Sequence, residues 1–212
     1  GRKFLYAVTQ MDGPDGKKVG AVASFAIDPA TGDLKELNRQ ASGGAGPCHV
    51  TVDAAGRNVL VANYSSGSVA VLPIEPDGKL RESASFIQHA GTVADVKRQG
   101  GPRAHSFNPS PDNRFAVAAD LGLDQLLVYK FDAAANKITP NEPPFAKVAP
   151  RSGPRHFALT PRASRICRIW SPRNAAGPSS QPYSRQPQPL SKPIMSARKG
   201  VLGMEFPFSP KR

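Results

Sequence analysis

Short runs of mostly apolar residues alternate with polar turns along the chain as far as residue 161. Six such runs are rich in Val, Ala and aromatic residues, and they cover residues 4–9, 22–27, 59–64, 69–74, 115–120 and 126–131. Gly, Pro, Asp or Asn bounds each run, and each run has the length of a β-strand. No window of about twelve residues carries the apolar stripe that a helix buries. The pattern therefore predicts an all-β protein with tight turns.

One phrase of glycine, proline and histidine occurs three times, at residues 46–49, 101–105 and 153–156. The histidines of successive copies are 56 and 51 residues apart. A recurrence near about 50 residues, with four predicted strands per unit, is typical of the blades of a β-propeller. An immunoglobulin-like sandwich also has regularly spaced strands, but nothing in that fold requires a repeated phrase.

The repeat divides the chain into a propeller part, residues 1–161, and a tail, residues 162–212. Residues 1–40 supply three strands of one blade, and residues 46–88 and 101–150 each supply a complete blade. We expect a β-propeller of which about three blades are present. Each histidine phrase should start the innermost strand of its blade.

The tail differs in charge and composition. Residues 1–161 carry 18 Lys and Arg against 15 Asp and Glu, whereas residues 162–212 carry 10 against 1, so most of the net charge of +12 lies in the tail. Residues 171–199 are rich in Pro, Ser, Gln, Arg and Lys, which bury too little apolar surface to offset the entropy of ordering. We expect an irregular basic tail, either a natural disordered segment or the product of a reading-frame change near Pro161. The loss of the repeat in mid-unit favours the frame change.

Cysteine spacing and hydropathy exclude several classes of protein. Cys48 and Cys167 form no disulfide framework and have no metal-ligand spacing. We expect Cys48 to be a small buried hydrophobe beside a strand. No run approaches the roughly 18 apolar residues of a membrane helix, and no secretory signal is present. We predict a cytoplasmic protein with no membrane partner, although the chain starts in mid-blade and a preceding signal stays an open alternative.

Several phrases of the propeller part resemble the bacterial lactonase family. This family of seven-bladed propellers includes 6-phosphogluconolactonase and the fungal carboxy-cis,cis-muconate lactonizing enzyme. The resemblance covers residues 1–161, and it implies a seven-bladed fold and lactonase activity. The phrases occur in order and at blade spacing, and they are residues 46–49, 61–69, 104–106, 110–115, 119–122 and 153–157.

The resemblance also implies site residues. The family's proposed active site contains the histidine of an Ala-His-Ser phrase, the arginine of a Gly-Pro-Arg-His phrase and a glutamate in the next strand. The first two correspond to His105 and Arg155, which are therefore the implied catalytic residues, and the glutamate has no counterpart here. Relatives have a second histidine where this chain has Arg103. We assign Arg103, His49 and His156 to substrate binding.

These residue types suit lactone hydrolysis, which needs a base for water and a positive group beside the developing oxyanion. A neutral His and an Arg supply both near pH 7, and neither a metal nor a cofactor is required. Side chains that enter successive blades at equivalent positions converge on the central opening, where a basic pocket attracts an acidic sugar lactone.

Each candidate also has a structural interpretation. The three histidines can hydrogen-bond a neighbouring blade, and Arg155 can form an ion pair between blades. Arg103 can be a solvated loop charge. Asp120 and Asp124 follow strands, where turn formation is their expected role.

Four functions stay open. The leading one is hydrolysis of a small-molecule sugar lactone such as 6-phosphogluconolactone, and the second is a muconate-type cycloisomerase. The third is a non-catalytic propeller that binds a partner through its channel face. The fourth, nucleic-acid binding by the basic tail, ranks last because aromatic residues are sparse there. The sequence leaves the oligomeric state open.

Overall fold

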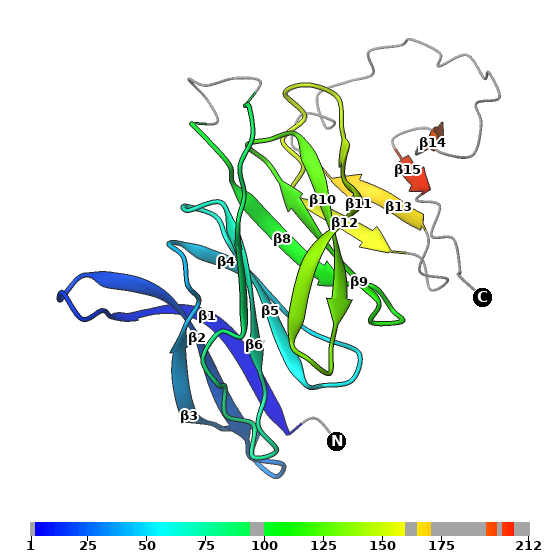
Figure 1. Cartoon of the computed structure of the whole chain (residues 1–212). Coiled ribbons are helices and arrows are strands. Elements are labelled where there is room, and N and C mark those ends of the chain that lie inside the picture. The colour runs from blue at the N-terminus through cyan, green and yellow to red at the C-terminus, as the bar shows by residue number, and fades with distance from the viewer. Residues whose placement is uncertain (1–2, 94–99, 160–164, 171–193, 199–200, 206–212) are drawn as a thin grey trace.

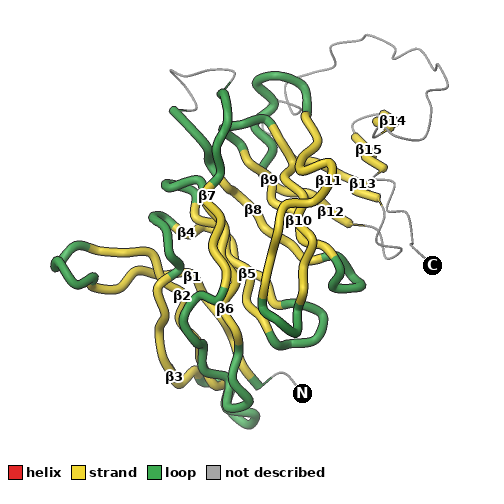
Figure 2. Tube along the Cα trace, in the orientation of Figure 1, coloured by secondary structure: helices red, strands yellow, loops and turns green. Residues whose placement is uncertain are grey.

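The computed structural model describes residues 3–93, 100–159, 165–170, 194–198 and 201–205. Within these ranges the chain consists of strands, turns and loops and contains no helix (Figure 2). The expected all-β class is therefore confirmed. Figure 1 shows the strands gathered into sheets that follow one another along the chain.

Consecutive antiparallel strands build the sheets up to residue 147. The first sheet contains β1 (Phe4–Asp12), β2 (Lys18–Ile27) and β3 (Leu34–Ala41). The second contains β4 (Pro47–Val52), β5 (Asn58–Asn63), β6 (Ser68–Pro73) and β7 (Ser85–Gln88). The third contains β8 (Ala104–Pro109), β9 (Phe115–Asp120), β10 (Gln125–Asp132) and β11 (Lys137–Lys147). The strand orders β4-β5-β6-β7 and β8-β9-β10-β11 match, as expected for propeller blades.

The histidine phrases lie at the starts of the first strands of these blades, as predicted. His49 is the third residue of β4, and His105 is the second residue of β8. β4 contacts β8, and β8 contacts β12 (His156–Leu159). The same end of each blade therefore carries one copy of the phrase.

Within the range 162–212, where the sequence predicts an irregular tail, the structure contains three strands. These are β13 (Arg165–Trp170), β14 (Ile194–Arg198) and β15 (Val201–Glu205), and they join β12 in a sheet of order β12-β13-β15-β14. The reason is local, because residues 165–170 and 201–205 contain Ile, Val, Leu and Trp, which favour extended backbone in any context. Residues 171–193 lie outside the described residues. For them the expectation stays a prediction, and so does the domain boundary at residue 161.

The turn between the first two strands of a blade explains why Gly or Asn occurs there. Gly56 and Asn113 occupy the same turn of the second and third blades, with φ of 68° and 57°. This left-handed conformation is accessible to Gly and, at small cost, to Asn. Asn113 also bonds the neighbouring blade. Its Nδ2 donates to Oδ2 of Asp53 at 2.6 Å, and its Oδ1 accepts from the backbone N–H of Ala54 at 3.0 Å.

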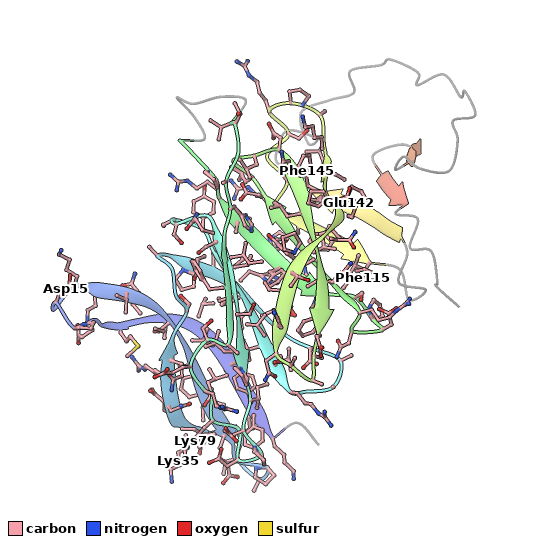
Figure 3. All side chains as sticks on the ribbon, viewed as in Figure 1. Asp15, Lys35, Lys79, Phe115, Glu142 and Phe145 are labelled. Carbon is pink, nitrogen blue, oxygen red and sulfur yellow. The ribbon has the colours of Figure 1, made fainter. Side chains whose placement is uncertain are left out.

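The core lies between adjacent sheets. Every residue of β5 and β6 is buried, because alternate side chains pack against the first and the third sheet. Leu60 of β5, for example, belongs to the cluster that contains Phe107 and Tyr129 of the third sheet. Outer strands are more open, and Figure 3 shows Glu142 and Phe145 on β11, where Phe145 is 36% exposed. Burial at roughly 25 cal/mol per Å² of apolar area is the main force that holds the blades together.

We expect Asn113→Gly to lower the free energy of unfolding by about 1–2 kcal/mol, because glycine keeps the turn but removes two hydrogen bonds between blades. Asn113→Ala should cost about 1 kcal/mol more, since alanine is strained at positive φ. Urea denaturation followed by circular dichroism measures both losses. Gly56→Ala is the control for backbone strain alone, and equal losses for the two Asn113 variants would contradict this account.

Candidate active site

The three histidines of the repeated phrase come together at one end of the blades. His49 lies on β4, His105 on β8 and His156 at the start of β12. The ring centroids of His105 and His156 are 5.0 Å apart, and those of His49 and His156 are 6.1 Å apart. Residues far apart in the sequence thus form one cluster, because they hold equivalent positions in successive blades.

Arg155 joins the cluster through His105. Its Nη1 donates to Nε2 of His105 at 3.2 Å, so Nε2 is the unprotonated nitrogen and Nδ1 carries the ring proton. Nδ1 of His105 and Nε of Arg155 are both buried, and neither has a hydrogen-bond partner among the described residues. Buried donors without acceptors are costly. Both side chains are only partly buried, so a bound molecule can reach their exposed atoms, whereas these two nitrogens are enclosed.

His49 takes part in the contact between blades. Its Nδ1 accepts a hydrogen bond from the backbone N–H of Phe107, in the next blade, at 3.3 Å. His49 therefore has the structural role that is the alternative to substrate binding. Only Nε2 of His49 can contact a substrate without breaking the bond between blades.

Two of the histidines are neutral at pH 7. Burial, then the positive Arg155 and then His156 lower the pKa of His105 to about 4. Burial, then His156 and then His105 lower the pKa of His49 to about 4. A neutral imidazole can accept a proton from water, but it stays a weak base while a positive charge lies beside it.

Tyr64 connects Arg103 to His105. The Tyr64 and His105 rings meet edge to face with centroids 5.7 Å apart, and the Arg103 guanidinium lies 5.8 Å from the centroid of the Tyr64 ring. Nη1 of Arg103 also donates to the carbonyl oxygen of Ser65. Sequence reasoning did not assign Tyr64 to the site. Its position in the chain could have indicated the site, because Tyr64 follows Asn63, the residue of β5 that pairs with the start of β4.

Cys48 is exposed, so the expectation of a buried hydrophobe is wrong. The pairing of β4 with β5 is irregular between Pro47 and His49, and this bulge interrupts the alternation of inward and outward side chains at Cys48. The thiol itself faces the carbonyl oxygen of His105 at 3.4 Å, and loss of solvation raises the pKa of Cys48 to about 11. Because the thiolate is the reactive form, Cys48 supplies no nucleophile at neutral pH.

Asp120 and Asp124 form turns, and they also hold the segments that enter the site. The Asp120 carboxylate accepts a hydrogen bond from the backbone N–H of Arg103 at 2.8 Å. The Asp124 carboxylate accepts from the backbone N–H groups of Arg151 and Gly153 at 2.6 and 2.7 Å. Each acid therefore fixes the backbone just before a site residue of the next strand.

The cluster carries positive charge without an acidic partner. In the described part of the chain, neither Arg103 nor Arg155 forms an ion pair, and no group of His, Cys, Asp and Glu has the geometry of a metal site. Unpaired guanidinium groups attract anions and bind their oxygens in pairs. A cavity of about 890 Å³ lies at the opposite end of the blades, where Lys3 and Arg57 line it, and it contains none of these site residues.

The model of the family described as "Lactonase, 7-bladed beta-propeller" matches residues 1–167. The chain belongs to this lactonase family. It is 38% identical over 159 residues to the 6-phosphogluconolactonase of Bacillus subtilis strain 168, a match that covers 75% of this chain and 43% of that protein. It is 33% identical over 158 residues to the 6-phosphogluconolactonase of Formosa agariphila, which covers 74% of this chain and 44% of that protein.

Solved structures agree with this assignment. A candidate 6-phosphogluconolactonase of Bacteroides fragilis is 35% identical with a TM-score of 0.70, over 80% of this chain and 47% of that one. The periplasmic gluconolactonase of Pseudomonas aeruginosa is 26% identical with a TM-score of 0.66, over 95% of this chain and 62% of that one. The lactonase chain thus spans less than half the length of the curated relatives it matches. Its described residues include no helix that could cross a membrane.

The contribution of Arg155 to the pKa of His105 can be measured directly. In Arg155→Met the pKa of His105 should rise from about 4 toward its ordinary value of 6.5, because the imidazolium no longer faces a positive charge, while burial keeps the pKa below that value. Arg155→Lys retains the charge and should keep the pKa low. An NMR titration of the histidine ring protons measures this in all three proteins. An unchanged His105 pKa in the Met variant would contradict the pairing.

Proposed function

We propose that this chain is part of a lactone hydrolase that acts on a sugar lactone, with 6-phosphogluconolactone as the foremost candidate. The observation that carries the proposal is the Arg155–His105 pair, which places an imidazole beside a guanidinium that has no carboxylate partner among the described residues. The 6-phosphogluconolactonase relatives support the same reaction. The carbonyl oxygen of a lactone is an acceptor for this guanidinium, and Arg103 is a second cation that can bind a phosphate.

Hydrolysis begins with attack of water on the carbonyl carbon of the lactone. His105 accepts a proton as the water oxygen bonds to that carbon. The carbonyl oxygen becomes an oxyanion, which Arg155 stabilises. The ring C–O bond then breaks, and the proton passes to the ring oxygen. One water is consumed and one hydroxy acid is formed, without an oxidant or a reductant.

Arg155 changes its hydrogen-bond partner in this mechanism. Before substrate binds, its Nη1 donates to the lone pair of His105 Nε2. When the substrate carbonyl oxygen takes this donor, the lone pair becomes free for a proton. The developing negative charge also offsets the guanidinium charge, which raises the basicity of His105. Substrate binding therefore activates the base.

Arg103, His49 and His156 bind the substrate in this proposal. Arg103 is held against Tyr64 and Ser65 and carries no acidic partner among the described residues, so it is the ligand for the phosphate. A phosphorylated sugar as substrate agrees with a cytoplasmic enzyme. The periplasmic gluconolactonase of Pseudomonas aeruginosa makes the unphosphorylated lactone the second candidate.

The 212-residue chain alone should hydrolyse 6-phosphogluconolactone no faster than its spontaneous rate. About three blades leave sheet faces uncovered and the site open to water. A chimera in which residues 1–159 replace the aligned part of the Bacillus subtilis relative should be active. Alkali consumption at constant pH measures lactone loss, and circular dichroism confirms folding. A fully active chain on its own would show that the site lies elsewhere.

Within the chimera, His105→Gln should lower kcat by about 10²- to 10⁴-fold, which is the usual contribution of a general base. Arg155→Lys keeps the charge but loses the paired donors, and it should lower kcat by about 10²-fold or more. Asn113→Gly, which removes hydrogen bonds between the second and third blades away from the site, is the control for loss of a contact between blades. Folded variants of His105 and Arg155 with full activity would favour a partner-binding propeller.

A further inference from the structure

A buried polar network lies between the second and third sheets, and the proposed mechanism does not use it. The network consists of His89, just after β7, Asp120 at the end of β9 and Tyr129 on β10. The Tyr129 hydroxyl lies 2.9 Å from Nε2 of His89, and Nδ1 of His89 lies 2.6 Å from Oδ2 of Asp120. None of the three residues is more than 3% exposed.

The hydrogen bonds of the network run in one direction. Burial, and then the Asp120 carboxylate, raise the pKa of Tyr129, so the phenol keeps its proton. A carboxylate oxygen can only accept, so Nδ1 of His89 carries the proton that it donates to Asp120. The Tyr129 hydroxyl then donates to Nε2. This arrangement satisfies both ring nitrogens of His89 in the absence of water.

The second oxygen of Asp120 holds the backbone beside the candidate site. Oδ1 accepts hydrogen bonds from the N–H groups of Arg103, Gly122 and Leu123 at 2.8, 2.9 and 3.0 Å. Together with His89 these give the buried carboxylate four donors, which offset the cost of removing its charge from water. Asp120 therefore fixes Arg103, two residues before His105.

The second blade shows that the repeat does not require this charge. Its equivalent residue is Asn63, which pairs with the start of β4 as Asp120 pairs with the start of β8. Asn63 donates from Nδ2 to the Ser42 carbonyl oxygen at 3.0 Å and to Ser68 Oγ at 3.2 Å. A neutral amide is thus enough to close a blade at this point. The carboxylate with its histidine occurs in the blade that carries Arg103.

We propose that His89 is a positioning residue for the candidate site, because its Nδ1–H holds Asp120 in the orientation that fixes the backbone of Arg103. The Arg103 guanidinium, which lies beside Tyr64, is thereby directed toward the substrate. The role of Arg103 in substrate binding rests on the proposed function, whereas the hydrogen bonds from His89 to Asp120 and from Arg103 to Asp120 do not depend on it. Without the Nδ1–H donor, Oδ2 of Asp120 faces an apolar interior and the carboxylate rotates away from Arg103.

Two substitutions in the 212-residue chain separate the two halves of the His89 ring. His89→Asn places an amide N–H₂ near the position of Nδ1, so it keeps the donor to Asp120 and loses the contact with Tyr129. His89→Gln places its amide near the position of Nε2, so it keeps the contact with Tyr129 and loses the donor to Asp120. Tyr129→Phe is the control, since it removes only the hydroxyl.

Amide hydrogen exchange, measured by NMR, reports the effect on the backbone. The Arg103 amide should exchange about tenfold faster or more in His89→Gln, because its bond to a charged acceptor is lost. It should exchange as in the original chain in His89→Asn and Tyr129→Phe. The Val117 and Ala118 amides on β9 are the reference for global stability. If the Val117 and Arg103 amides exchanged faster by the same factor, His89 would only stabilise the fold, and the proposal would be overturned. Identical exchange rates of the Arg103 amide in the Asn and Gln variants would also overturn it.

Calorimetric titration of the chimera and its His89 variants with 6-phosphogluconate, the product of the proposed reaction, reports the effect on the site. We expect about tenfold weaker binding in His89→Gln and a change within about twofold in His89→Asn. An equal affinity in both variants would overturn the positioning role. If the chimera binds no 6-phosphogluconate while Arg103 exchange still separates the variants, the contact with Arg103 stands and the proposed substrate is wrong.

Discussion

The packing of each sheet on the next is the constraint that locates every residue of the candidate site. β5 and β6 are buried on both faces, so the second blade is held between its neighbours along its whole length. Because successive blades share one strand order, stacking them brings the starts of β4, β8 and β12 to the same end. His49, His105 and His156 meet there, although each comes from a different sheet.

The stacking of blades brings the histidines together, and the positive charges of Arg103 and Arg155 determine the chemical properties of this cluster. Burial, and then Arg155, lower the pKa of His105 and keep it neutral, while Arg103 and Arg155 have no acidic partner in the described ranges. Two buried donors of the Arg155–His105 pair also lack acceptors. Guanidinium groups without a carboxylate partner suit an oxygen-rich anion, which connects the observed geometry with the substrate that we propose.

Equivalent positions at the strand ends carry different residues in the second and third blades, although the backbone is the same. Gly56 and Asn113 share one turn conformation, and Asn113 also bonds the preceding blade through its side chain. Asn63 and Asp120 share one register, yet only Asp120 has a histidine partner and binds the backbone of a site residue. The repeat thus supplies a scaffold, and a few polar residues on it give one blade contacts that the other lacks.

The blades and their turns could be read from the sequence, because strand periodicity and turn chemistry are local properties of the chain. The same repeated phrase, with the family resemblance, singled out His105 and Arg155. The role of Tyr64, the network of His89 with Asp120 and the low pKa of His105 depend on contacts between blades, which no local pattern encodes. The exposure of Cys48 depends on a bulge in β4, and the strands β13, β14 and β15 depend on short apolar runs within a tail whose average composition predicts none. Tertiary structure decided these features, because burial and partner identity are set only when distant segments pack together.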